Sequence, residues 1–410
     1  MDRETLVLRN KGMAEAFHQP PLKHTIRRGL LKIAARIPIS RTAERGTQRV
    51  LLIRPDHLGD VLLATPALRE LRQAFPQAEL HALVGEWSAE VLAYFQDIDF
   101  ALTLPFPGFR RAAVSTAFSP YQLALTSARK LRHIGYQAAV ILRPDHWWGA
   151  LICFLAGIPV RIGYAHPDVA PFLTDALPVR HEHVVVQNAR LVRHYIAANG
   201  QVPQPGDTID ALPLTFPVNE ADRGAIDDEL YARAVADDTP LIVIHPGGGT
   251  WIKRWEAHKW AQTADALADT LDARIVFTGG DHERDLVREI EAAMRHDAVS
   301  LVGETSIGGL AALYQRARIV LGVDSGPMHL AAAVGKPTVT LFGAADPVEF
   351  GTWGAYHRHP MLFSDIGCRP CRVLDWGSDD PTYHPCVREI SVARVLEAAN
   401  RALHDTANRG

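Results

Sequence analysis

The chain has only four cysteines among 410 residues, which argues against a framework of disulfide bonds. No continuous apolar run approaches the ~18 residues that a membrane-spanning helix needs. The first residues, Met-Asp-Arg-Glu-Thr, lack the apolar core of a secretory signal peptide. These three absences together predict a cytoplasmic protein without a transmembrane segment.

Two common nucleotide-binding motifs are also missing. Neither G-x-G-x-x-G after a first strand nor G-x-x-x-x-G-K-[ST] occurs, which disfavours a dinucleotide oxidoreductase and a P-loop ATPase. No convincing H-x-x-x-H or clustered-carboxylate metal motif occurs, and we expect no cofactor. Asp97-Ile98-Asp99 has the D-x-D spacing of metal-dependent sugar transferases. It lies between apolar residues of a predicted strand, and we interpret it as structural.

Three of the cysteines gather near the C-terminal end. Cys368-Arg-Pro-Cys371 is followed by His384 and Cys386. Three thiols and an imidazole could bind zinc, but a closed zinc knuckle usually has a second pair of ligands at short spacing, and here a single cysteine follows. The sequence leaves a metal at these residues open, and we assign no metal site.

Charge is distributed unevenly along the chain. The net charge is −3, yet residues 1–49 carry eleven Lys/Arg against four Asp/Glu. Within this segment apolar residues recur at helical spacing with basic residues between them: Leu22, Ile26, Leu30, Ile33 and Ile37, alternating with Lys23, Arg27, Arg28, Lys32 and Arg36. A basic amphipathic helix of this kind can lie on an anionic membrane surface. The alternative is a helix packed on the protein with its charges in solvent. Nucleic-acid binding is disfavoured because the rest of the chain is acidic.

Apolar strands and amphipathic helices alternate twice along the chain, which predicts an α/β protein with parallel, doubly wound sheets. One series begins at Arg49 and the other at Leu241, and a stretch rich in Pro, Gly, Asp and Thr separates them. We therefore expect two Rossmann-like domains facing across a cleft. The predicted division is a basic extension (1–48), a first domain (49–205), a linker (206–220), a second domain (221–345) and a C-terminal tail with a closing helix (346–410).

A short internal repeat follows two of the strands in the first series. Arg54-Pro-Asp-His57 recurs as Arg143-Pro-Asp-His146, each time after an apolar strand and before a helix. Because parallel strands end at the same edge of a sheet, both loops should open on one edge. Duplication and coincidence explain the repeat equally well.

The stretch from Ile319 to Pro337 is the most informative about function. An apolar run stops at Asp324 and Ser325, Pro327 then stands where a helix starts, and Gly335 closes that helix. The pattern predicts a buried strand, a tight turn and a short helix, whose free N–H groups suit a phosphate. A second glycine-rich turn, His245–Thr250, leads to Lys253 and Arg254. Two such turns in one half of the chain suggest a diphosphate ligand.

Three motifs in order give a specific resemblance. Arg49–Arg69, with Asp60 and Pro66, looks like the opening motif of glycosyltransferase family 9, the ADP-heptose:lipopolysaccharide heptosyltransferases. His245-Pro-Gly-Gly-Gly with Lys253-Arg-Trp resembles the family's second signature, and Gly322–His329 its third. The resemblance implies the GT-B architecture, with the acceptor bound mainly by the first domain and the nucleotide-sugar by the second. It also implies direct displacement with inversion, and no cofactor.

The resemblance assigns the two catalytic roles. Asp60 matches the family's base for the acceptor hydroxyl; the alternative is that it only caps a helix starting at Val61. Lys253 matches the residue that stabilises the departing diphosphate, with Arg254 as a helper. Taken alone, Lys and Arg in such a position are usually solvated surface charges.

Other residues are implied in binding. The donor would be held by Gly247, Gly248 and Gly249, which let the backbone approach the ligand, and by Glu283 at the ribose, where Asp281 is an alternative. The third signature adds four further donor contacts, namely Asp324, Ser325, Gly326 and His329. A buried helix cap and a core histidine would explain those residues without a ligand.

Acceptors of the family are anionic sugars, which would suit positive groups at the strand ends. The candidate acceptor contacts are Arg54, His57, Asp145 and Arg161. Ion pairs between these arginines and Asp56 or Asp145 are the alternative.

The leading hypothesis is therefore an inverting glycosyltransferase. It would move heptose or a related sugar from a nucleoside-diphosphate donor, ADP-heptose by resemblance, to a lipopolysaccharide core or similar lipid-linked saccharide. The expected place is the cytoplasm, with contact to the inner-membrane surface through residues 22–37. A GT-B nucleotide-sugar 2-epimerase and a non-catalytic sugar-binding scaffold are the alternatives.

Overall fold

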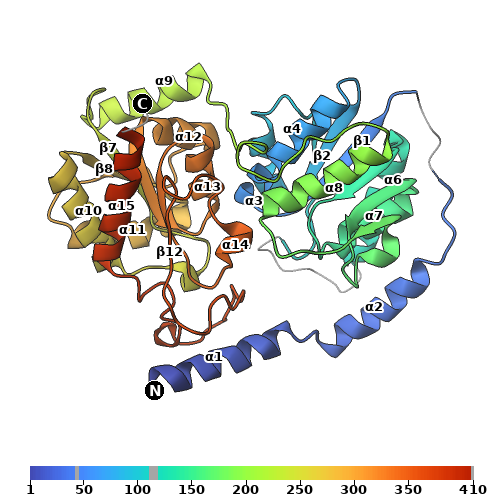
Figure 1. Ribbon diagram of the computed structural model, residues 1–410, viewed down its shortest axis with the longest axis horizontal. Coiled ribbons are helices and arrows are strands. Elements are labelled where there is room, and N and C mark those ends of the chain that lie inside the picture. Colours follow the sequence, from blue (N-terminus) through green and yellow to red (C-terminus); the bar gives the residue numbers. More distant parts are fainter. Residues whose placement is uncertain (42–45, 110–118, 408–410) are drawn as a thin grey trace. The chain divides into compact units, whose positions relative to one another are not determined.

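A computed structural model describes residues 1–41, 46–109 and 119–407 (Figure 1). The chain forms two compact units, Pro20–Pro213 and Met1–Gln19 with Leu214–Gly410. It therefore passes between the units twice, once at residue 213, inside the stretch 206–220, and once at residue 19. The basic extension is divided between them, because α1 (Arg3–His18) belongs to the second unit and α2 (Leu22–Ala34) to the first.

The first unit contains a six-stranded parallel sheet in the order β3-β2-β1-β4-β5-β6. Its strands are β1 (Arg49–Arg54), β2 (Glu79–Val84), β3 (Phe100–Thr103), β4 (Ala138–Ile141), β5 (Val160–Tyr164) and β6 (Asp175–Leu177). The central strands β1 and β4 are mainly apolar, and all their residues except Arg49 are buried, as expected for a parallel sheet covered by helices on both faces. This is the Rossmann strand order, so the predicted fold class is confirmed for this unit.

Helices connect these strands. They are α3 (Leu58–Leu62), α4 (Thr65–Ala74), α5 (Ala89–Leu92), α6 (Ser119–Ile134), α7 (Trp147–Ala156) and α8 (Val184–Ala198), with 3-10 turns η1 (Glu86–Ser88) and η2 (Ala170–Phe172). The amphipathic pattern of residues 61–75 predicts one helix, and this prediction is wrong, because the structure divides the stretch between α3 and α4. Pro66 has no N–H to bond to Leu62, so a second helix starts there, and the Thr65 hydroxyl donates to the Leu62 carbonyl at 2.8 Å.

The D-x-D segment lies just before β3, not inside a strand as predicted. Asp99 accepts a hydrogen bond from the Leu80 backbone N–H at 2.7 Å and pairs with Arg72. These contacts join the segment to β2 and α4, so its structural interpretation is confirmed.

The second unit repeats the topology of the first. Its sheet has the order β12-β11-β10-β7-β8-β9, which is the Rossmann order when counted from β7. The strands are β7 (Leu241–His245), β8 (Arg274–Phe277), β9 (Val299–Ser300), β10 (Ala317–Val323), β11 (Thr338–Leu341) and β12 (Met361–Leu362). Two Rossmann-like domains of this kind make up the GT-B architecture, which the sequence predicted.

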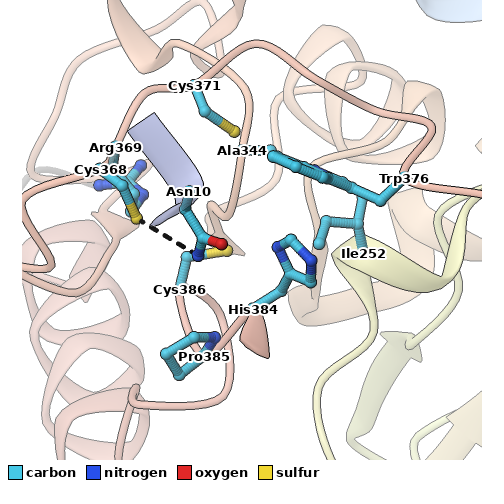
Figure 2. Close-up of a pocket in the computed structure, with 10 residues that line it drawn as sticks. All are labelled: Asn10, Ile252, Ala344, Cys368, Arg369, Cys371, Trp376, His384, Pro385 and Cys386. Carbon is cyan, nitrogen blue, oxygen red and sulfur yellow. Dashed lines mark hydrogen bonds between the residues drawn. The ribbon is translucent and has the colours of Figure 1, made fainter. Parts of the chain in front are cut away.

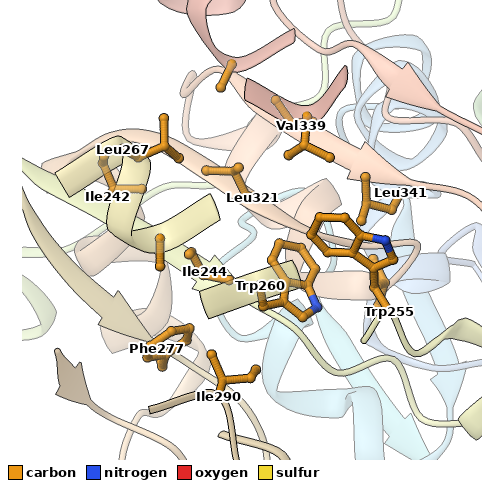
Figure 3. Packing of buried hydrophobic residues seen from close by; sticks show 14 of the residues in the cluster. Ile242, Ile244, Trp255, Trp260, Leu267, Phe277, Ile290, Leu321, Val339 and Leu341 are labelled. Carbon is orange, nitrogen blue, oxygen red and sulfur yellow. The ribbon is translucent and has the colours of Figure 1, made fainter. Parts of the chain in front are cut away.

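Several helices and 3-10 turns cover this second sheet. They are α9 (Glu220–Ala232), α10 (Ala257–Leu271), α11 (Arg284–Ala293), α12 (Ile307–Arg316), α13 (Gly326–Ala333), α14 (Pro347–Phe350) and α15 (Val392–Ala407), with η3 (Trp251–Lys253), η4 (Asp281–Glu283) and η5 (Pro381–Tyr383). Trp255, from the second signature, and Trp260 are buried in the core (Figure 3), with ring centroids 4.9 Å apart. The Trp255 indole N–H donates to the Ile390 carbonyl at 3.0 Å. These tryptophans fix the chain directly after Lys253.

The first helix is tied to the C-terminal tail of the same unit. Arg3 pairs with Asp365 at 2.6 Å, and Arg9 with Asp379 at 2.8 Å. The buried Asn10 amide donates to the Tyr383 carbonyl at 2.7 Å. None of the helices in the described part of the chain combines the length and apolar character that crossing a bilayer requires.

Candidate active site

The two copies of the Arg-Pro-Asp-His repeat meet at one edge of the first sheet. β1 and β4 are parallel neighbours, with Ile53 opposite Ile141, so the loops that follow them emerge side by side. Arg143 from the second loop pairs with Asp56 from the first. The prediction that both loops open on the same edge is confirmed.

Asp56 is the buried centre of this cluster. Arg54 Nε lies 2.8 Å from Asp56 Oδ2, and the Arg143 guanidinium contacts Asp56 Oδ1. The backbone is fixed as well, because Trp87 Nε1 and Ser88 Oγ donate to the Asp56 carbonyl at 3.0 and 3.1 Å. Burial alone would raise the pKa of Asp56, but the two guanidinium groups hold it below its ordinary value.

Asp60 follows Asp56 in the chain and belongs to the helix after the loop. It belongs to the first turn of α3, whose N-cap is His57, so the interpretation of Asp60 as a cap for a helix starting at Val61 is wrong. Its Oδ1 accepts a hydrogen bond from Arg54 Nη2 at 3.0 Å, and 27% of the side chain is exposed. Desolvation, and then the negative charge of Asp56, raise the pKa of Asp60 despite Arg54. The loop thus holds two carboxylates with opposite pKa shifts, and Asp60 is the stronger base.

The second loop adds a charged pair and a neutral imidazole. Arg143 Nε lies 2.5 Å from Asp145 Oδ1, and this charge lowers the pKa of Asp145 although burial opposes it. His146 is buried, and neither ring nitrogen has a hydrogen-bond partner within the described residues. Burial lowers the pKa of His146 to about 3, so the ring is neutral. Sequence reasoning missed His146 as a site residue, although the repeat contains it.

The predicted acceptor residues do not all gather here. Arg54 and Asp145 belong to this edge, and His57 is exposed beside Trp87, with ring centroids 6.1 Å apart. Arg54 forms an ion pair with Asp56, and Asp145 forms one with Arg143, as the alternative interpretation of these residues predicted. Arg161 is separate, because it stands at the start of β5, opposite Ala139, at the other end of the strands. Its guanidinium donates to the Phe172 carbonyl at 2.6 Å, a structural contact.

In the second unit, two turns adjoin at the same edge of the sheet. β7 and β10 are parallel neighbours, with His245 opposite Gly322, and the glycine turn and the Asp324 turn follow directly. The strand, turn and helix predicted for 319–337 are confirmed as β10, an N-cap at Ser325, and α13 with Pro327 in its first turn.

Lys253 joins these two turns. Its Nζ lies 2.7 Å from Asp324 Oδ2 and donates to the Asp324 carbonyl at 2.9 Å. Only 14% of the Lys253 side chain is exposed, so it is not a solvated surface charge. An ammonium group has three N–H donors, and among the residues that the structure describes two of them are used, which leaves the third for a ligand. Arg254, by contrast, is exposed.

Two hydroxyl groups of these turns are buried. Ser325 Oγ, at the N-cap of α13, and Thr250 Oγ1, at the N-cap of η3, are buried without a hydrogen-bond partner among the described residues. Buried polar groups are normally satisfied, so each unpartnered hydroxyl points to a missing ligand or water. Sequence reasoning named Ser325 but missed Thr250, since a threonine after a glycine run carries no distinct signal.

Close packing explains the glycines of the turn. A Cβ at Gly247 would lie 1.7 Å from Glu283 Oε1, one at Gly248 would lie 2.8 Å from Val323 Cγ2, and Gly249 has φ +74°. Glu283 is buried, and its Oε2 accepts the Gly280 N–H at 2.8 Å. The Glu283 carboxylate therefore supports the glycine turn, and contact with a ribose stays a prediction.

Two further residues of the third signature begin α13. Gly326 is its first residue, and His329 is buried in its first turn. At the end of β7, His245 Nδ1 lies 3.0 Å from Thr278 Oγ1, and burial lowers the pKa of His245.

The three C-terminal cysteines and Asn10 line a small pocket (Figure 2). The Asn10 amide lies 4.0 Å from Cys368 Sγ, and His384 Nε2 is 2.8 Å from Asp379 Oδ2. Burial raises the pKa of Cys386 to about 11, so its thiol stays protonated. Within the described ranges, no three His, Cys, Asp or Glu side chains are grouped so that they could hold a metal ion.

Comparisons with known proteins give the family. The sequence profile of glycosyltransferase family 9 (heptosyltransferase) matches residues 125–375, more than half of the chain. Lipooligosaccharide heptosyltransferase 2 of Haemophilus ducreyi is 26% identical over 371 residues, covering 87% of this chain and 99% of the relative.

Two solved structures share the fold. The family 9 glycosyl transferase of Veillonella parvula superposes with a TM-score of 0.71 at 22% identity, over 89% of this chain and 100% of that one. The ADP-heptose lps heptosyltransferase II of E. coli superposes with a TM-score of 0.66 at 22% identity, over 88% of this chain and 100% of that one. These two structures share the fold, and the profile match shows that this chain is a glycosyltransferase and belongs to glycosyltransferase family 9.

Proposed function

We propose that the protein transfers heptose from ADP-heptose to a lipopolysaccharide core saccharide, with inversion at the anomeric carbon. The relatives' names support heptosyl transfer to lipopolysaccharide or lipooligosaccharide. The observation that carries the proposal is the pair of turns that Lys253 joins at the N-terminus of α13. Within the described part of the chain, one ammonium donor of Lys253 and the hydroxyls of Thr250 and Ser325 have no hydrogen-bond partner. Each of these suits the oxygens of a diphosphate.

In this mechanism Asp60 takes the proton of an acceptor hydroxyl. The hydroxyl oxygen forms a bond to the anomeric carbon while the bond from that carbon to the diphosphate oxygen breaks on the opposite face, so the configuration inverts. The electron pair leaves with the diphosphate, whose new charge Lys253 and the N–H groups of Ser325 and Gly326 stabilise. Asp60 suits its role because its raised pKa makes it a stronger base than an ordinary aspartate.

The acceptor side belongs to the first domain in this proposal. Arg54 orients Asp60, and Arg143, Asp145 and His57 border the acceptor saccharide. Because that saccharide is carried by a lipid, the enzyme works at the cytoplasmic surface of the inner membrane, through residues 22–37.

Transfer assays with the full chain test the proposal. ADP-heptose and a heptose-deficient core saccharide should give a product one heptose larger and ADP in equal amount. UDP- and GDP-sugars serve as donor controls. Consumption of donor without acceptor would instead support the epimerase, and the absence of affinity for any nucleoside diphosphate in calorimetry would support the scaffold.

The pH dependence of turnover is a further prediction. A raised pKa means that Asp60 gains its proton at a higher pH than an ordinary aspartate of pKa ~3.9. As the pH falls through that value, the base is lost and kcat/KM declines. Steady-state rates from pH 4.5 to 8, with circular dichroism at each pH to exclude unfolding, measure this. A profile flat down to the pH of unfolding would contradict the role of Asp60.

A further inference from the structure

The second helix carries its apolar stripe on the outside. Five aliphatic side chains of α2 and the turn after it are 57–76% exposed: Leu22, Ile26, Leu30, Ile33 and Ile37. Their spacing places them along one face of the helix. An ordinary surface helix turns its apolar face toward the core, so this arrangement is reversed.

The opposite face of α2 holds the helix on the first domain. Arg28 Nε lies 2.6 Å from Asp168 Oδ1, and the Arg27 guanidinium lies 4.6 Å from the centre of the Trp147 ring. Leu31 is buried in the domain core, and Ala35 packs against the same cluster. The charge of Arg28 contributes to the lowered pKa of Asp168, although burial opposes it. The exposed stripe is thus fixed outward by contacts on the other side of the helix.

The charge around the stripe identifies its partner. No Asp or Glu occurs from residue 16 to residue 43, while Lys32, Arg36 and Arg41 are exposed. Lys32 and Arg36 follow Leu31 and Ala35 by one position, which places them beside the stripe at the border of the two faces. An apolar stripe flanked by cations matches the acyl and headgroup layers of an anionic bilayer.

We propose that this face of α2 docks the enzyme on an anionic membrane surface. The inference rests on the proposed function and deepens it, because it identifies which face of α2 would meet the bilayer and the anionic lipids that this face would bind. The stripe enters the acyl boundary, and Lys32, Arg36 and Arg41 contact lipid phosphates.

Vesicle binding tests the proposal without nucleotide or acceptor, so its result is independent of the donor and sugar. The full chain should sediment with vesicles of phosphatidylglycerol and phosphatidylethanolamine, and at least tenfold less with phosphatidylcholine. Ile26→Gln/Ile33→Gln should weaken binding at least tenfold while leaving transfer to a lipid-free core saccharide unchanged. The matched control is Val202→Gln/Tyr231→Gln, because both are large, exposed, mainly hydrophobic side chains that lie outside α2.

A second pair of variants tests the charges. Lys32→Gln/Arg36→Gln should weaken binding to anionic vesicles and reduce its dependence on salt. The proposal is overturned if the isoleucine variant binds vesicles like the wild type. It is also overturned if light scattering shows a dimer that the isoleucine variant alone dissociates, since a second copy would then cover the stripe.

Discussion

Replacing Asp60 with asparagine should lower kcat by about 10²- to 10⁴-fold, the usual contribution of a general base. Asparagine keeps the size of the side chain and an oxygen that can accept the bond from Arg54 Nη2, which spans 3.0 Å in the native protein. It loses only the ability to take a proton. Rates of ADP release with saturating donor and acceptor measure the effect.

Two controls separate lost chemistry from lost structure. Affinity for ADP should stay within about twofold, because the groups around Lys253 belong to the other domain. The free energy of unfolding at neutral pH should not fall, since a carboxylate with a raised pKa is less stable ionised in the folded protein than in the unfolded chain. Asp97→Asn makes the same change at a half-buried aspartate outside the Arg54–Asp60 loop. Similar losses of activity in both variants would contradict a role for Asp60.

Local patterns in the sequence predicted the fold well. The strand, turn and helix of 319–337 are specified by neighbouring residues, namely an apolar run, Ser325 as N-cap and Pro327 in the first turn. The alternation of such units was sufficient to predict two parallel sheets. The break between α3 and α4 was missed, although Pro66 marked it, because the apolar periodicity continues across the proline.

The site was harder to predict, because its properties depend on contacts between distant segments. The residues of the Arg54–Asp60 loop could be named, but the pKa shift of Asp60 depends on burial and on Asp56, and Asp56 is held by Arg143, 87 residues away. Arg161 is a residue that the sequence suggested for the site and that the structure places elsewhere. It is a plausible anion contact by type, yet its place at the start of β5 puts it at the far end of the strands.

The orientation of α2 shows another limit. Periodicity revealed that its apolar residues share one face, but it did not reveal which face meets the protein. The orientation of the helix depends on the ion pair of Arg28 with Asp168 and on the packing of Arg27 over the Trp147 ring. No local pattern around residue 30 predicts these contacts.

Replacing Lys253 with methionine should lower kcat about 10²- to 10³-fold, the effect of removing one group that stabilises developing negative charge. Methionine fills a similar volume but removes the ammonium that lies 2.7 Å from Asp324 Oδ2. Affinity for ADP should also fall, both because a cation beside the diphosphate is lost and because the unpaired Asp324 carboxylate would repel it.

Lys259→Met is the matched control for Lys253→Met. The Lys259 ammonium likewise contacts one carboxylate, Glu256 at 2.7 Å, and one carbonyl, that of Arg388 at 2.6 Å, but it lies on α10 outside the two turns. We expect its loss to reduce stability modestly and to leave kcat within about threefold. Arg254→Met tests the helper role, for which a smaller loss than that of Lys253→Met is expected. Equal losses in the two lysine variants would show that Lys253 acts through stability, and the diphosphate would then need another counter-charge.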